Sequence, residues 1–86
     1  MKEQFDFGQA IAHLKDGKKV QRAGWNGKGM YLQFQDERYL AYPDDLASED
    51  RPHKIDAHIL MRTVQCTLVP WLASQTDILA EDWQLF

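Results

Sequence analysis

The amino-acid sequence predicts a single α+β domain, residues 1–86. It is expected to be a mostly antiparallel sheet with an N-terminal helix packed on it and a short helix before the last strand. A length of 86 residues suits one domain. Residues 7–16 place apolar side chains at helical spacing, whereas several later segments alternate or are continuously apolar over strand-like lengths. These three observations define the fold class.

The N-terminal helix is predicted over residues 7–16. Asp6 can cap its first turn, and Gln9 stands where the partner residue of a capping box stands. Gly17 follows at the position where helices commonly end in a left-handed residue. The side chains predicted to form the buried face are Phe7, Ala10, Ile11 and Leu14.

The sheet is predicted from short apolar or alternating segments. Residues 30–35 alternate with a period of two, and 38–42 are expected to return beside them. Residues 58–64 are expected to pair with 66–69 through a turn near Gln65. The predicted strands cover 18–22, 30–35, 38–42, 58–64, 66–69 and 82–86, and 43–56 are predicted to form a surface loop.

Residues 23–29 are predicted to form a loop in which Trp25 is accompanied by three glycines and an Asn-Gly pair. An aromatic side chain in a surface loop is either pinned to the core or available to a ligand, and the sequence leaves both readings open. The glycines would allow the backbone to approach a phosphate. Their spacing does not match a P-loop, and no Gly-Lys-Ser/Thr follows.

A Pro-Trp corner precedes the short predicted helix. Pro70 ends the strand before it, because proline cannot donate to a ladder. Ser74 or Thr76 can cap the helix, and Asp77 suits its first turn. Trp71 beside free helical N–H groups would suit a flat, anionic ligand, through ring stacking and phosphate contacts. The alternative is that Trp71 fills the core and the hydroxyl residues only cap the helix.

Composition excludes several classes of protein. A net charge of −3 argues against binding duplex nucleic acid, which needs a basic face. The single Cys66 excludes an intramolecular disulfide. There is no apolar run of about 18 residues to span a membrane and no signal-peptide segment, so we expect a soluble, cytoplasmic protein. A short chain with 12% aromatic residues is expected to self-associate.

The sequence contains no catalytic motif. Cys66 and His13 lie in different predicted elements, so no local nucleophile–base pair forms. The adjacent acids Glu81 and Asp82, like Asp44 and Asp45, are interpreted as solvated surface groups. Histidines 53 and 58 match no standard metal-ligand spacing. We therefore predict a binding protein without catalytic residues, metal or cofactor.

Three segments closely resemble one protein family. Residues 7–10, 22–30 and 69–83 resemble small phage and prophage proteins known as the second type of Thoeris anti-defence protein. The resemblance implies a homotetramer that binds a cyclic ADP-ribose isomer made by bacterial TIR-domain enzymes, in the cytoplasm of the infected host cell. Sequestering that signal would stop activation of the defence effector. Some family members are also thought to bind cyclic dinucleotides at a separate place.

The resemblance also implies the site residues. Trp25 and Trp71 would stack on the adenine, and Asn26 would read the edge of a base or ribose. Ala73 would contribute its backbone N–H and Asp77 a contact to a ribose hydroxyl. Thr76 is a further candidate from the same motif. We add Arg22 and Lys28 on grounds of charge, because their cationic groups could face phosphate.

Two departures from the family pattern stand out. Gln65-Cys66 occupies the place of an Asp-Gly turn, which is expected to weaken or reshape that turn. Residues 35–57 match poorly, so a second ligand site that draws on them would be altered here. Two other functions compete with sequestration. One is hydrolysis of the same signal, and the other is an oligomeric interaction or toxin-like protein with no small-molecule ligand.

Overall fold

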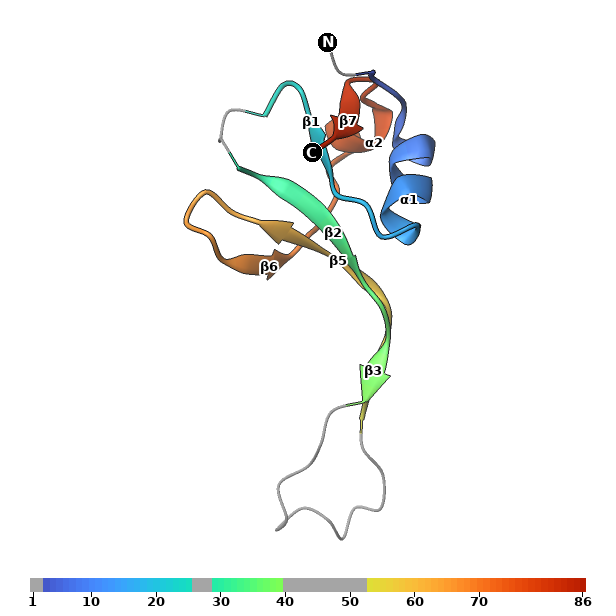
Figure 1. The fold of residues 1–86 in the computed structure, drawn as a ribbon, viewed down its shortest axis with the longest axis vertical. Coiled ribbons are helices and arrows are strands. Elements are labelled where there is room, and N and C mark those ends of the chain that lie inside the picture. Colours follow the sequence, from blue (N-terminus) through green and yellow to red (C-terminus); the bar gives the residue numbers. More distant parts are fainter. Residues whose placement is uncertain (1–2, 26–28, 40–52) are drawn as a thin grey trace, which may run out of the picture.

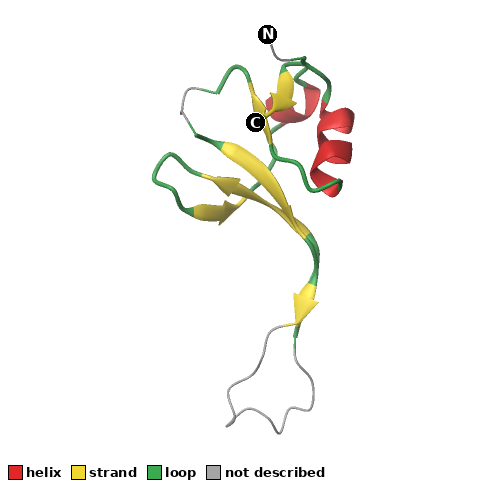
Figure 2. Ribbon diagram, viewed as in Figure 1, coloured by secondary structure: helices red, strands yellow, loops and turns green. Residues whose placement is uncertain are grey.

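A computed structural model describes residues 3–25, 29–39 and 53–86. Its described residues form a five-stranded antiparallel sheet in the order β6-β5-β2-β1-β7, with a separate two-stranded ribbon (Figure 1). The predicted α+β class is confirmed, including the N-terminal helix and the short helix before the last strand (Figure 2). In chain order the elements are α1 (Phe7–Lys15), β1 (Val20–Arg22), β2 (Tyr31–Gln35), β3 (Arg38–Tyr39), β4 (Lys54–Ile55), β5 (His58–Arg62), β6 (Leu68–Pro70), α2 (Gln75–Leu79) and β7 (Trp83–Leu85).

Helix α1 forms where local sequence signals predicted it, ending one residue earlier than expected. The Asp6 carboxylate accepts from the Gln9 amide at 2.8 Å, and the Gln9 side chain accepts from the Asp6 amide at 3.1 Å, so the capping box is complete. Gly17 has a φ of 86°, which ends the helix in the left-handed conformation. Ala10 and Leu14 are fully buried and hold α1 against the sheet.

The core lies between α1 and the sheet and is centred on Trp83. Leu14 of α1, Val20 of β1 and Leu32 of β2 are fully buried with it. Val20 pairs with Leu32 across the β1–β2 ladder, so both side chains point to the helix-covered face. Phe5 joins Trp83 through two backbone hydrogen bonds of 2.8 and 3.2 Å. The first and last elements of the fold therefore close on each other.

The central pairing differs from the prediction. Strand β2 pairs with β5, whereas residues 38–42 were predicted to return beside 30–35. Pairing with β5 places Phe34 opposite Ile59 and Leu32 opposite Met61, which puts apolar side chains on the helix-covered face. The turn predicted at 36–37 does not reverse the chain. The Asp36 carboxylate accepts from the amide of the next residue, Glu37, at 2.8 Å.

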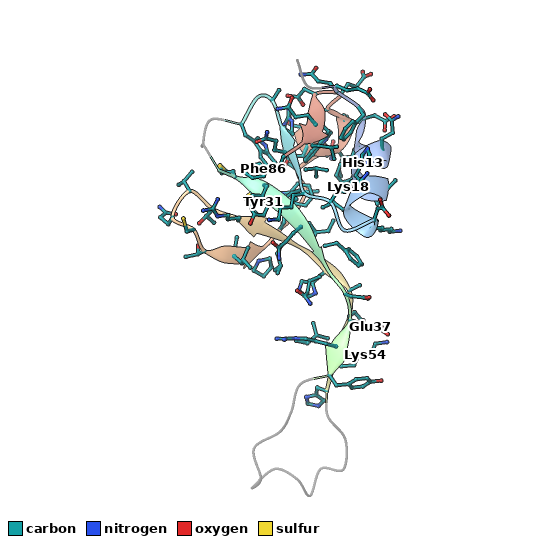
Figure 3. The ribbon with its side chains drawn as sticks, in the orientation of Figure 1. His13, Lys18, Tyr31, Glu37, Lys54 and Phe86 are labelled. Atoms are coloured by element: carbon teal, nitrogen blue, oxygen red, sulfur yellow. The ribbon has the colours of Figure 1, made fainter. Side chains whose placement is uncertain are left out.

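The chain instead continues outward from the sheet as a ribbon (Figure 1). Strand β3 pairs with β4, so Lys54 and Ile55 belong to a strand and not to the predicted surface loop. Lys54 Nζ lies 2.6 Å from a Glu37 carboxylate oxygen, and the two side chains meet on this ribbon (Figure 3). Residues 40–42 and 43–52, which complete the predicted strand and most of the predicted loop, lie outside the described residues.

The turn between β5 and β6 spans residues 63–67. Thr63 N donates to Thr67 O at 2.8 Å, and Cys66 N donates to Thr63 O at 3.0 Å. Cys66 has a φ of 65°, the left-handed conformation that favours glycine. The turn therefore keeps a shape suited to Asp-Gly although neither residue is present. Cys66 and Thr67, predicted as strand, belong to this turn.

The other strands were predicted in the right places but one or two residues too long. Pro70 is the last residue of β6 and pairs with Leu60 at the edge of the sheet, where its missing N–H costs least. Among the described residues, no helix combines the length and apolar character needed to cross a membrane.

Candidate functional site

Trp25 and Trp71 both contact the buried ring of Trp83. The ring centroids of Trp25 and Trp83 lie 5.4 Å apart at an interplanar angle of 79°, and those of Trp71 and Trp83 lie 6.1 Å apart at 86°. Trp25 and Trp71 themselves are half-buried. Each indole thus packs on the core in a T-shaped arrangement while part of its surface remains accessible. The structure shows that both side chains pack on the core, and their availability to a ligand stays a prediction.

A cavity of about 600 Å³ lies between α1, the β2–β5 ladder and the Pro-Trp corner. Trp71 and Ala73, two of the candidate site residues, form part of its wall. This volume falls within the range of small-molecule and cofactor pockets. Lys15 and His58 are its polar side chains, and the rest of the lining is apolar or aromatic. The lining residues are Phe7, Ile11, Leu14, Lys15, Phe34, Ala57, His58, Ile59, Trp71 and Ala73.

The polar side chains of the cavity come from opposite walls. Lys15 stands in the last turn of α1, and His58 begins β5. His58 Nδ1 lies 2.8 Å from the carbonyl oxygen of Asp56, which fixes the ring's orientation. The sequence prediction missed both residues. A signal for Lys15 was available, because its neighbour Leu14 was predicted to lie on the buried face of the helix.

Arg22 forms an ion cluster with Asp77 and Asp82. Its Nε donates to Asp82 Oδ1 at 2.8 Å, and its Nη1 donates to Asp77 Oδ1 at 2.9 Å. The three side chains are only 18%, 15% and 28% exposed in that order. Hydrogen bonds first to Asp82 and then to Asp77 raise the pKa of Arg22 above its ordinary value. Asp82 had been interpreted as a solvated surface acid, which is wrong.

The surroundings of both carboxylates in the ion cluster favour their ionised form. Burial acts to raise the pKa of Asp77, but hydrogen bonds from Arg22 and Ser74 outweigh it and hold that pKa below its ordinary value. Burial likewise acts to raise the pKa of Asp82, and hydrogen bonds from Arg22 and the Gly24 amide outweigh it, so that pKa is also lowered.

Helix α2 is capped by Ser74, which resolves the choice between Ser74 and Thr76. Asp77 N donates to Ser74 Oγ at 3.1 Å, and Ser74 N donates to Asp77 Oδ2 at 3.4 Å, which completes a second capping box. Thr76 is exposed in the first turn. Asp77 therefore has two structural duties, capping α2 and binding Arg22, so its contact to a ribose hydroxyl stays a prediction.

The remaining predicted site residues are Arg22, Asn26 and Lys28. Arg22 already compensates two carboxylates, so its expected contact to phosphate also stays a prediction. Asn26 and Lys28 lie outside the described residues. In the part of the chain that the structure describes, no three His, Cys, Asp or Glu side chains are grouped to hold a metal ion.

The fold and cavity define a small α+β domain with an aromatic pocket of ligand size. The sequence model of the Thoeris anti-defense 2-like domain matches residues 5–86, and the chain belongs to this family. It is 37% identical over 94 residues to Thoeris anti-defense 2 of Bacillus phage SP01, an alignment that covers 99% of this chain and 98% of that protein. Family membership supports an anti-defence role.

Proposed function

We propose that this protein binds and sequesters a cyclic ADP-ribose-type immune signal, glycocyclic ADP-ribose, made by bacterial TIR enzymes. Holding the signal without cleaving it would block Thoeris anti-phage defence in the cytoplasm of the infected cell. The observation that carries this proposal is the cavity of about 600 Å³ walled by Trp71 and Ala73, in a chain of the Thoeris anti-defense 2-like family.

The chemistry of the cavity suits such a ligand. An adenine ring can stack on the accessible part of Trp71, and stacking of a base on an aromatic side chain is worth roughly 1–3 kcal/mol. Lys15 can face the pyrophosphate, and His58 adds a polar ring on the opposite wall. Trp25 packs on the same Trp83 ring but is not part of the cavity wall, and its role as a second stacking surface rests on the family resemblance.

The proposal includes self-association as a homotetramer. Edge strand β6 and the corner after it expose apolar side chains, with Leu68 50% and Leu72 92% exposed. On the sheet face opposite α1, Tyr31 packs against Phe86 at a centroid distance of 4.6 Å (Figure 3). Light scattering after size exclusion should give about four times the chain mass of 10.0 kDa. A stable monomer would contradict this part of the proposal.

A capture-and-release experiment tests sequestration. The protein in excess is mixed with glycocyclic ADP-ribose, and free nucleotide is measured in the filtrate before and after heat denaturation of the protein. We expect the nucleotide to disappear from the first filtrate and to return intact in the second. A matched pair of variants, Trp71→Ala in the cavity wall and Tyr39→Ala on the exposed ribbon, should lose and keep capture respectively.

The other outcomes assign the protein to the competing functions. Linear or hydrolysed nucleotide after denaturation would indicate a hydrolase of the same signal. Nucleotide that never leaves the first filtrate would favour an interaction or toxin-like protein. A parallel titration with a cyclic dinucleotide tests the second ligand class, and competition between the two nucleotides would show whether they share one site.

A further inference from the structure

The two chain segments that carry most of the candidate site, residues 22–25 and 71–77, are joined by the ion pair of Arg22 and Asp77, and a side chain from neither segment, Asp82, holds Arg22 in place. Asp82 precedes β7 and does not line the cavity. Its Oδ1 accepts from Arg22 Nε at 2.8 Å, and Arg22 Nη1 donates onward to Asp77 at 2.9 Å. The end of β1 is thereby connected to the helix that follows the Trp71 corner.

The second oxygen of Asp82 holds the start of the Trp25 loop. Gly24 N donates to Asp82 Oδ2 at 2.9 Å, and Ala23 N donates to the Asp82 carbonyl at 3.0 Å. Trp25 N in turn donates to Arg22 O at 3.2 Å, which closes the loop's first turn. Asp82 therefore accepts from the guanidinium and from the loop backbone at the same time.

The contact at Gly24 leaves little space for a side chain. A Cβ added there would lie 3.2 Å from Asp82 Oδ2, closer than an ordinary van der Waals contact. The φ of Gly24 lies outside the left-handed region, so this contact and not backbone strain opposes alanine there. Partial burial of the ion cluster keeps its charge-assisted bonds from being fully screened by solvent.

We propose that Asp82 is a positioning residue for ligand binding. It holds the backbone of the loop that carries Trp25 and orients the Arg22 guanidinium that bonds to Asp77, so ligand affinity depends on Asp82 although it lies outside the cavity. This inference rests on the proposed function, because the affinity concerned is that for glycocyclic ADP-ribose.

A double-mutant cycle tests the inference, with calorimetric titration of glycocyclic ADP-ribose into four proteins: wild type, Asp82→Asn, Trp25→Ala and the double variant. If Asp82 acts through the Trp25 loop, Asp82→Asn should weaken binding about tenfold in the wild type and less than about twofold in the Trp25→Ala background. Equal losses in both backgrounds, or no loss in the wild type, would overturn the proposal. Glu81→Gln is the matched control, since this exposed neighbour should leave affinity unchanged.

A second readout needs no ligand. Acrylamide quenching of tryptophan fluorescence should increase in Asp82→Asn and in Gly24→Ala, which disturbs the same contact from the other side. The increase should vanish when Trp25→Phe is added, because the affected ring would be absent. If the wild type does not bind the nucleotide, the proposed function fails, and quenching alone decides whether Asp82 positions Trp25. Unchanged quenching in both variants would overturn the positioning role.

Discussion

The indole Nε1 of Trp83 donates to the backbone carbonyl of Asp77 at 3.0 Å, which ties the fully buried ring of β7 to helix α2. Removing this ring should unfold the protein. Trp83→Ala is expected to cost about 3–5 kcal/mol, a large share of the stability of a small domain. Thermal unfolding followed by circular dichroism should show no cooperative transition in Trp83→Ala. A wild-type melting curve in this variant would contradict the central role given to Trp83.

Trp25→Ala and Trp71→Ala should keep the fold and lose ligand. Both rings are half-buried, so their removal leaves the centre of the core in place. Each should weaken glycocyclic ADP-ribose binding roughly 5- to 150-fold, the equivalent of about 1–3 kcal/mol of stacking. Calorimetric titration measures the loss, and circular dichroism checks the fold. Variants that are folded and bind as the wild type does would remove these residues from the site.

Lys15→Ala should weaken binding of the anionic nucleotide and make the remaining affinity less sensitive to salt, because one cation facing the cavity is lost. Titrations at low and high ionic strength measure both effects. Lys18→Ala is the control. The Lys18 ammonium lies 3.7 Å from Asp16, and Lys18 is not part of the cavity wall. The nucleotide affinity of Lys18→Ala and the salt dependence of that affinity should therefore match those of the wild type.

Cys66→Gly should stabilise the protein. Cys66 adopts the left-handed conformation, which costs a residue with a Cβ about 1–2 kcal/mol relative to glycine. Relief of about 1 kcal/mol should raise the melting temperature by roughly 4–8 °C. Cys66→Ser separates backbone strain from the loss of the Arg62 Nη2 contact to Sγ at 2.9 Å, because serine keeps the strain. Equal melting temperatures for the glycine and serine variants would exclude relief of strain.

The ion cluster should make stability sensitive to acid. The folded-state pKa values of Asp77 and Asp82 are lowered, so their contribution is complete above the unfolded-state value of about 3.9 and is lost as the pH falls through the folded-state values. Urea unfolding from about pH 6 to about pH 3 should therefore show a steeper loss in the wild type than in Asp82→Asn. Parallel pH curves for the two proteins would show that Asp82 is not coupled to Arg22.

The sequence predicted the elements whose determinants are local. Helix α1 could be located because Asp6, Gln9 and Gly17 all lie within a few residues of its ends. The hairpin of β5 and β6 was found for a similar reason, since a short turn joins two apolar segments. Where several strands could pair, the local sequence pattern was insufficient to identify the partner strand. The choice of β5 over residues 38–42 as the partner of β2 depends on the shared core, which the alternation of one segment does not encode.

The site shows the same limit. The tryptophans were identified as candidates because aromatic side chains in a glycine loop and at a Pro-Trp corner are unusual in sequence. Asp82 was missed because its partner Arg22 is 60 residues away, and an acid beside Glu81 is typical of a solvated surface. His58 was considered only as a metal ligand and set aside, whereas the fold places it in the wall of an organic cavity.

The closure of Trp83 on Phe5 has a consequence for synthesis of the chain. Helix α1 and strand β1 leave the ribosome long before Trp83 is translated, yet their buried side chains pack around that ring. The nascent chain must therefore expose the apolar face of α1 until β7 emerges, and the native core is expected to form only after translation has passed Trp83. During that interval the growing polypeptide exposes apolar side chains of the kind that chaperones bind.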